Sequence, residues 1–208
     1  MLVITNVRGV YVMAGGSQPS TRDKIMLAAI DLMAEKGYAG VSTKEIAAAA
    51  GFSEMTLFRH FGSKQNLLET TVDRFYYTAE MKKLFSEKLV WDLQTDLLLV
   101  SRTYHESMNR NRKTLMIIMK EAHNLPGFRE RVHKHPQQLK EMLTQYFETM
   151  QKKGKMIETN AEAQALSFML MNYGAFISHL QSGHLFANVG LEEWIETSVR
   201  SFAKAVTP

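Results

Sequence analysis

The sequence predicts an all-α protein in which a small N-terminal group of three helices precedes a larger helical bundle, with about nine helices in all. After residue 19, apolar residues recur at spacings of three and four almost to the end of the chain, which is the period of a helix. Capping residues and glycines divide this pattern into short segments first and longer ones later. The composition, with 45% apolar and 22% charged residues, is that of an ordinary globular protein.

The segment before the first predicted helix differs from the rest. Its first 16 residues are rich in β-branched side chains and end in Gly-Gly, so we expect an extended conformation. Arg8 interrupts a short apolar run, and a secretory signal is not expected there. Met13 precedes a plausible second start. We interpret residues 1–19 as an N-terminal extension or a misplaced start.

Capping residues set the limits of the first two predicted helices. Ser20, with Asp23 three residues on, caps a first helix that stops at Gly37. Ser42 and Glu45 have the spacing of a capping box, in which each side chain accepts a hydrogen bond from the backbone of the other. They start the second helix.

A glycine turn leads into a third helix of barely two turns. Gly51 ends the second helix, and Ser53 caps the third, which covers residues 54–61. The Gly-Ser-Lys stretch at 62–64 breaks the helix again, and a fourth helix is predicted from Lys64 to about Phe85. A helix as short as the third is marginal in water, so its neighbours must hold it in place.

Five longer helices complete the prediction. Pro126 is expected near the start of the third of these, and Pro136 should kink it or begin a fresh helix. Thr159 and Glu162 have capping-box spacing at the start of the fourth. The last two helices are predicted at about residues 159–182 and 190–205.

The pattern at residues 43–62 is a helix, a tight turn and a second helix, the arrangement that places the second helix in the DNA major groove. Ala47 is small enough for the helices to approach, and Gly51 tolerates the left-handed backbone of the turn. Met55, Thr56 and Arg59 are predicted to point outward. Arginine binds guanine through two hydrogen bonds, and the other two offer a methyl contact to thymine.

Other residues of this segment have supporting roles in the prediction. His60 and Lys64 are placed for contact with phosphate groups, which hold a protein in register on DNA. Leu57, Phe58 and Phe61 are predicted to face the core. A plain helical hairpin with a charged outer face fits the same spacing, so spacing alone leaves both alternatives open.

The longer string at residues 21–75 closely resembles the DNA-binding domain of the TetR family of bacterial transcription regulators. The resemblance rests on Gly-Tyr after the first helix and on the strings STKEIA, AGFS, LFRHF and SKQNLL. It implies a DNA-binding domain at residues 20–83, with the motif at about 43–62. It also implies a C-terminal domain at 84–208 for effector binding and dimerisation.

The resemblance further implies which residues meet DNA. Lys64 matches a lysine that commonly contacts phosphate in the family. Phe58 stands where tyrosine is more frequent, and because it lacks the hydroxyl we interpret it mainly as a packing residue. The implied DNA-facing residues are Thr43, Ser53, Met55, Thr56, Arg59 and His60.

Charge and composition restrict the partners only weakly. The net charge of +4 favours an anionic partner, but residues 1–83 hold 10 Lys and Arg against 8 Asp and Glu. The prediction of double-stranded DNA therefore depends on the placement of residues. The absence of cysteine fits a reducing cytoplasm, and no apolar run is long enough to span a membrane. We expect a cytoplasmic protein without a membrane partner.

Methionine is abundant in the second part of the chain, with nine of the 14 after residue 80. These residues form either an ordinary helical core or an adaptable cavity, because methionine repacks around varied ligands. In the second case the ligand is a small, largely apolar effector. The residues predicted to line its cavity are Tyr104, Met108, Met119, Met142, Phe147 and Phe168.

The last two predicted helices carry broad apolar faces. As the resemblance implies, two copies of each would pack into a four-helix interface around a two-fold axis. Such a homodimer requires a roughly palindromic DNA site. The predicted interface residues are Tyr173, Ile177, Leu180, Trp194 and Phe202.

Nothing in the sequence favours catalysis, a cofactor or a metal. The seven histidines follow no spacing of metal ligands, and neither a Ser-His-Asp order nor a glycine-rich phosphate loop is present. The sequence predicts a sequence-specific repressor that a small apolar ligand releases from a palindromic operator. The alternative is a helical ligand-binding or scaffolding protein without specific DNA binding.

Overall fold

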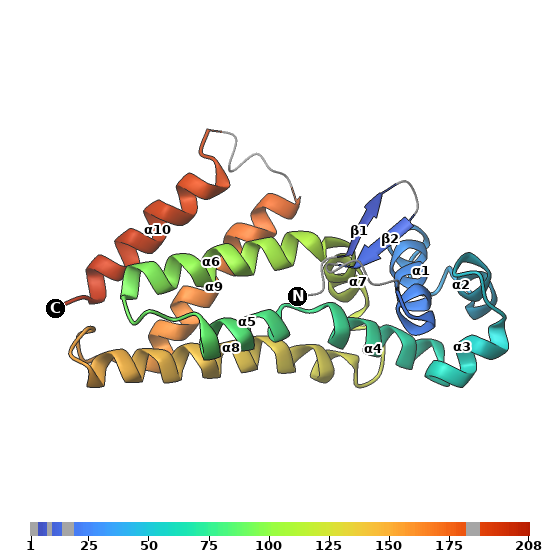
Figure 1. Cartoon of the computed structure of the whole chain (residues 1–208), viewed down its shortest axis with the longest axis horizontal. Helices are drawn as coiled ribbons and strands as arrows, with labels where there is room; N and C mark the ends of the chain where they lie inside the picture. Colours follow the sequence, from blue (N-terminus) through green and yellow to red (C-terminus); the bar gives the residue numbers. More distant parts are fainter. Residues whose placement is uncertain (1–3, 8–9, 14–18, 182–187) are drawn as a thin grey trace. The chain divides into compact units, whose positions relative to one another are not determined.

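The computed structural model describes residues 4–7, 10–13, 19–181 and 188–208. Strands β1 (Ile4–Val7) and β2 (Val10–Met13) pair as an antiparallel hairpin, with Ile4 opposite Met13. From Thr21 on, the described residues form ten helices (Figure 1). The predicted all-α class is confirmed. The predicted end of a helix at residue 182 lies outside the described residues.

The helices belong to two compact units. The first holds the hairpin with α1 (Thr21–Lys36), α2 (Thr43–Ala49), α3 (Glu54–Phe61), α4 (Lys64–Phe75) and α7 (Arg112–Glu121). The second holds α5 (Thr78–Glu87), α6 (Leu93–Arg110), α9 (Ala161–Gln181) and α10 (Leu191–Val206). Helix α8 (Phe128–Lys152) begins in the first unit and continues in the second.

In the first unit, α1 packs against α2, α4 and α7 (Figure 1). Ser20 Oγ accepts the Asp23 backbone N–H at 3.1 Å, and the Asp23 carboxylate accepts from the Ser20 backbone, so this predicted cap is confirmed. Arg131, at the start of α8, donates to Glu69 at 3.0 Å and to Asp73 at 2.6 Å on α4. These ion pairs fix the start of α8 against α4.

In the second unit, α6 packs against α5, α9 and α10. The core between α8, α9 and α10 is aromatic: the Phe202 ring lies 6.0 Å from Phe147 and 5.4 Å from Phe168. The buried Asp96 carboxylate accepts 2.9 Å hydrogen bonds from Tyr146 Oη and from the Val90 backbone N–H. Burial raises the pKa of Tyr146, and the negative charge of Asp96 raises it further. Asp96 therefore ties α6 to α8 and to the loop before α6.

The predicted fourth helix, from Lys64 to about Phe85, is wrong. Helix α4 ends at Phe75, Tyr76 is extended with ψ 157°, and α5 begins at Thr78. Contacts within the second unit hold Tyr77 and the first residue of α5: the Tyr77 ring lies 5.2 Å from Tyr104, and Thr78 Oγ1 is 2.8 Å from His135 Nδ1. These tertiary contacts outweigh the helical spacing of the segment.

The capping prediction for Thr159 and Glu162 is also wrong. Helix α9 starts at Ala161, and the side chain of Asn160 accepts the Ala163 backbone N–H at 3.0 Å. Glu162 instead pairs with Lys140 of α8 at 2.6 Å. Helix α8 itself passes through Pro136 without a fresh start.

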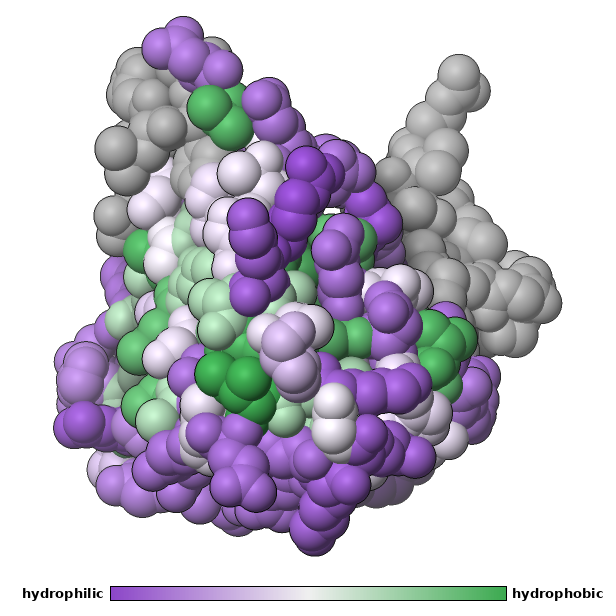
Figure 2. All heavy atoms as spheres, turned by 90° about the vertical axis from the view of Figure 1, so that its left-hand side faces the viewer, coloured by the Kyte–Doolittle hydropathy of each residue, from purple (hydrophilic) through white to green (hydrophobic). Residues whose placement is uncertain are grey.

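The surface of the second unit is partly apolar. Figure 2 shows the side on which α10 ends and the α5–α6 and α8–α9 loops lie, where hydrophobic residues gather in a central area bordered by hydrophilic ones. Within the described ranges, no helix has the length and apolar character needed to cross a membrane.

Candidate DNA-binding helix and effector cavity

The turn between α2 and α3 brings the two helices into close contact. Gly51 has φ +80°, a left-handed conformation that L side chains rarely adopt. Its N–H donates to Ala48 O at 3.0 Å, and the Phe52 N–H donates to Ala47 O at 2.9 Å. Ile46 and Leu57 are fully buried, one from each helix. The short α3 is therefore held from behind by α2 and needs little stability of its own.

Polar contacts fix the first turn of α3. Ser53 Oγ accepts the Thr56 backbone N–H at 3.2 Å, which confirms the predicted cap, and the two side-chain hydroxyls are 3.0 Å apart. Thr43 Oγ1 donates to Glu54 Oε1 at 2.5 Å, which links the start of α2 to the start of α3. Because a hydroxyl has one proton, Thr43 can accept a further hydrogen bond but donates elsewhere only by releasing Glu54.

The outer face of α3 carries a long apolar side chain and a cation. Met55 is 81% exposed, and Arg59, four residues later on the same face, is also exposed. Among the described residues, Arg59 has no ion-pair partner. Phe58 is 44% exposed, so the interpretation of this residue as mainly packing is wrong. The Phe58 ring is therefore partly buried, between the buried Leu57 and the exposed outer face of α3.

Two more cationic side chains lie near α3, one on α4 and one on α1. Lys64, the first residue of α4, has its Nζ 4.4 Å from the centre of the Tyr38 ring, and partial burial lowers the pKa of Lys64. Arg22 of α1 is exposed and lies 4.9 Å from the centre of the Phe61 ring. His60 is half-buried beside Phe61. Arg22 and Tyr38 are not among the residues predicted from the sequence to meet DNA, although Tyr38 belongs to the Gly-Tyr motif.

These features define a helix-turn-helix protein. The inner side of its second helix, α3, packs against α2, and the outer side is exposed and free to contact DNA. Residues 25–71 match the family described as "Bacterial regulatory proteins, tetR family". The chain is 32% identical over 188 residues to the uncharacterized HTH-type transcriptional regulator YvkB of Bacillus subtilis, covering 90% of this chain and 97% of YvkB. The chain belongs to the TetR family and is a helix-turn-helix transcriptional regulator, not an enzyme.

A further relative agrees with this assignment, and a solved structure shares the fold. The HTH-type transcriptional repressor AcnR of Corynebacterium glutamicum is 27% identical over 173 residues, which cover 83% of this chain and 88% of AcnR. A crystal structure from Mesorhizobium loti, described as that of "a putative TetR-family transcriptional regulator", has a TM-score of 0.72 at 20% identity. The match covers 90% of this chain and 97% of that chain, and at this identity it supports the fold alone.

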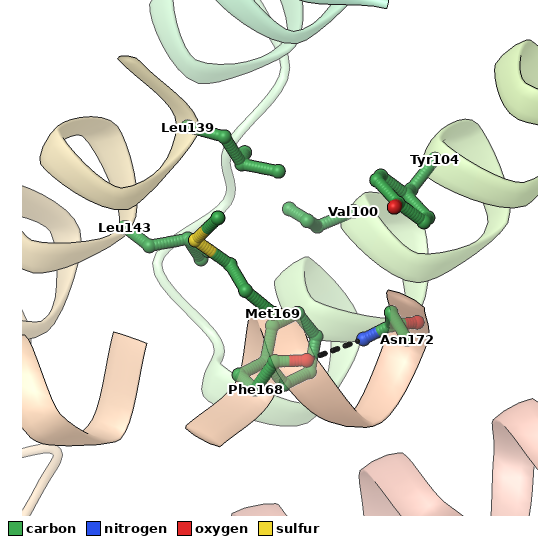
Figure 3. A pocket seen from close by; sticks show the side chains of 7 residues that line it. All are labelled: Val100, Tyr104, Leu139, Leu143, Phe168, Met169 and Asn172. Carbon is green, nitrogen blue, oxygen red and sulfur yellow. Dashed lines mark hydrogen bonds between the residues drawn. The ribbon is translucent and has the colours of Figure 1, made fainter. Parts of the chain in front are cut away.

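The second unit contains a mostly apolar cavity between α6, α8 and α9 (Figure 3). The empty volume is about 200 Å³, and part of it is open to solvent. The enclosed part has room for about one water molecule. The Met169 side chain extends toward Leu143 in the close view. The residues that line the cavity are Val100, Tyr104, Leu139, Leu143, Phe168, Met169 and Asn172.

Two of the six residues predicted to line an effector cavity, Tyr104 and Phe168, lie at this one. Met108 and Phe147 are buried, and Met142 is half-buried, but none of these three is among the lining residues. Met119 belongs to α7 in the first unit and is exposed. Asn172 was missed, although it is a single amide in an otherwise apolar stretch of α9.

The residues predicted for a dimer interface lie on two helices. On α9, Tyr173 is exposed, while Ile177 and Leu180 are half-buried. On α10, Trp194 and Phe202 are half-buried and contact other aromatic rings, Trp194 with His105 and Phe202 with Phe147 and Phe168. The α9 residues therefore offer the more accessible apolar surface within one chain.

Because His105 on α6 is buried, we expect the protein to lose stability in acid. Burial lowers the pKa of its imidazole from 6.5 to about 4, although the neighbouring Asn172 side chain raises it in part. Between these values the unfolded chain binds a proton that the folded chain does not, so the free energy of unfolding falls as the pH falls. At roughly 1.4 kcal/mol per pKa unit, we expect His105 to account for about 2 kcal/mol of loss between pH 7.5 and 4.5.

Urea unfolding of the wild type and of His105→Gln at both pH values measures this contribution. The wild type should lose about 2 kcal/mol more than the variant on acidification, whatever the offset between them at pH 7.5. Equal losses would show that His105 does not titrate abnormally in the folded protein.

Proposed function

We propose that the protein is a homodimeric repressor that binds a palindromic operator and is released by a small, largely apolar ligand. The observation that carries the proposal is the clamped α3 with Met55 and Arg59 on its outer face. Repression is supported by the relative AcnR, which is named as a transcriptional repressor. Such a protein acts in the cytoplasm, where the DNA is.

In this proposal the residues of the first unit divide into base readers and phosphate contacts. Arg59 reads guanine through two hydrogen bonds, and Met55 and Thr56 provide apolar contacts to thymine methyl groups. The groups assigned to phosphate are the Lys64 ammonium, the Ser53 hydroxyl and His60. The Thr43 hydroxyl joins them by releasing Glu54, because a phosphate oxygen can only accept a hydrogen bond. Arg22 joins them because its exposed guanidinium lies over Phe61 of α3.

The second unit supports the proposed dimer through α9. Leu166, Leu170, Tyr173 and Ile177 follow one another at spacings of four, three and four, and the first three are exposed. This is the spacing of a helix that packs along a partner helix. A two-fold axis at this stripe would present two copies of α3 to two half-sites, hence the palindrome.

Ligand release requires a ligand that distinguishes the DNA-binding state from the released state. The enclosed space between α6, α8 and α9 has room for about one water molecule, far less than common ligand sites of roughly 300–1,000 Å³, so a ligand must displace side chains such as Met169 to enter. This displacement would change how three helices of the second unit pack. Tenfold to hundredfold release from DNA needs about 1.4–2.8 kcal/mol of coupling.

The test is a mobility shift with the DNA upstream of the protein's own gene, repeated over a range of salt concentrations and with hits from an apolar-compound screen. We expect binding that weakens steeply with salt, together with a ligand that releases the DNA. By linkage, operator DNA must weaken ligand binding by the same factor. Equal ligand affinity with and without operator would reject ligand release, and failure to prefer any upstream fragment would reject the repressor.

A further inference from the structure

Three polar side chains of the second unit are buried without hydrogen bonds at one atom each. They are Ser101 Oγ, His105 Nε2 and Asn172 Oδ1, on residues that are at most 4% exposed. Ser101 and His105 lie one turn apart on α6, and Asn172 lies on α9. A buried polar atom without a partner destabilises the folded state, so three together call for an explanation.

Ser101 differs from other hydroxyls on helices of this protein. Thr71, Thr144 and Thr149 each donate to the carbonyl oxygen four residues earlier, at 2.7–2.8 Å. Ser101 makes no such bond, although the same carbonyl position is available on α6. Its hydroxyl is therefore available both to donate and to accept.

The hydrogen bond made by the amide nitrogen of Asn172 fixes the orientation of its side chain. Asn172 Nδ2 donates to the Phe168 carbonyl oxygen at 2.9 Å (Figure 3). A carbonyl oxygen only accepts, so the atom bonded to it must be the NH₂ group, and Oδ1 must be the unpaired atom. Asn172 also lines the cavity between α6, α8 and α9. Asn172 thus contributes a buried acceptor to the cavity wall. His105 is near enough for Asn172 to raise its pKa, but no hydrogen bond of normal geometry satisfies Asn172 Oδ1.

His105 makes the surroundings of this acceptor neutral and aromatic. Its ring packs edge to face with Tyr104 at 5.6 Å and with Trp194 at 5.9 Å. Since burial lowers the pKa of His105 to about 4, the imidazole is uncharged at neutral pH. A carboxylate or an ammonium group placed here would be buried without a counter-charge, which is strongly unfavourable.

We propose that the effector is an uncharged molecule with a hydrogen-bond donor, such as a hydroxyl on an aromatic ring, that donates to Asn172 Oδ1 while its apolar body occupies the cavity. His105, whose side chain neighbours Asn172, and Ser101, one turn earlier on α6, do not line the cavity and meet the polar end of the ligand only when it displaces side chains of the wall. Val100, Leu139 and Met169 contact the apolar body. This inference rests on the proposed ligand-released function, and it specifies the chemical class of that ligand.

The probes are 4-ethylphenol and its methyl ether, 4-ethylanisole, titrated calorimetrically into the full-length protein at neutral pH. The two differ in whether the oxygen carries a proton. We expect the phenol to bind about tenfold more tightly, because the ether leaves Asn172 Oδ1 unpaired. Asn172→Leu, which keeps the size but removes the acceptor, should bring the ratio of affinities close to one.

Two further variants separate hydrogen bonding from packing. Met169→Leu changes the apolar wall only, so it should alter both affinities by similar factors and keep the tenfold ratio. His105→Phe keeps a ring between Tyr104 and Trp194 but removes Nε2, so it should weaken the phenol severalfold and leave the ether unchanged. His105→Phe also serves as the test if Asn172→Leu does not fold.

Each result decides between the inference and its alternatives. Equal affinities of the wild type for phenol and ether, or no binding of either at millimolar concentration, would overturn the inference while leaving operator binding intact. A preference for phenol that survives in Asn172→Leu and also in His105→Phe would mean that the phenol hydroxyl donates to neither residue, which also overturns it. Selective phenol binding without release of operator DNA would support this site and reject ligand release.

Discussion

Replacing Arg59 with alanine is expected to weaken operator binding by about 1–3 kcal/mol and to relax the preference at one base position in each half-site. Arg59 is exposed on the outer face of α3, and among the described residues it has no ion-pair partner that would occupy its guanidinium. Its removal should leave the fold unchanged, because exposed substitutions usually alter stability by less than about 0.5 kcal/mol. Equilibrium binding to the operator and to single-base variants, at matched salt, measures both effects.

Lys64→Ala is the matched control for this prediction. Lys64 lies beside Tyr38 at the start of α4 and is assigned to a phosphate, so its loss should weaken binding to all sequences alike. The slope of log affinity against log salt should fall by roughly one unit. If Arg59→Ala bound the operator as tightly as the wild type, α3 would not be the reading helix in the way proposed.

The parts of the fold that the sequence predicted well depend on local interactions. The caps at Ser20, Ser42 and Ser53 each involve a partner three residues away, so the spacing of residue types is enough to find them. The exposed positions of Met55 and Arg59 follow from helical periodicity once the buried Leu57 is placed. These short-range rules covered most of the first unit.

The predictions that failed depend on contacts between residues far apart in the sequence. Nothing near Tyr76 in sequence marks the end of α4, because the following residues are held by Tyr104 and His135. Met119 was assigned to the cavity by residue type, yet α7 packs against α1 in the first unit. The bond between Thr43 and Glu54 spans 11 residues and changes what the Thr43 hydroxyl can donate. Helical spacing carries no information about such partners.

Leu170→Arg is expected to convert the proposed dimer into a folded monomer with strongly reduced operator affinity. Leu170 is 57% exposed within one chain and stands in the α9 stripe between Leu166 and Tyr173. At an interface with a two-fold axis, the substitution would place two like charges in an apolar contact, at a cost of several kcal/mol. Light scattering at micromolar concentration should report the mass of one chain, with helical content unchanged by circular dichroism.

Loss of the dimer has a larger effect on DNA binding than loss of any single contact. A monomer engages one half-site at a time, and linked binding of two half-sites can raise affinity by roughly 10²–10⁴. Val90→Arg is the control, because Val90 is 62% exposed and belongs to the loop before α6, not to the α9 stripe. It should remain dimeric with the operator affinity of the wild type. A dimeric Leu170→Arg, or a wild type that is already monomeric, would contradict the proposed interface and with it the reason for a palindromic operator.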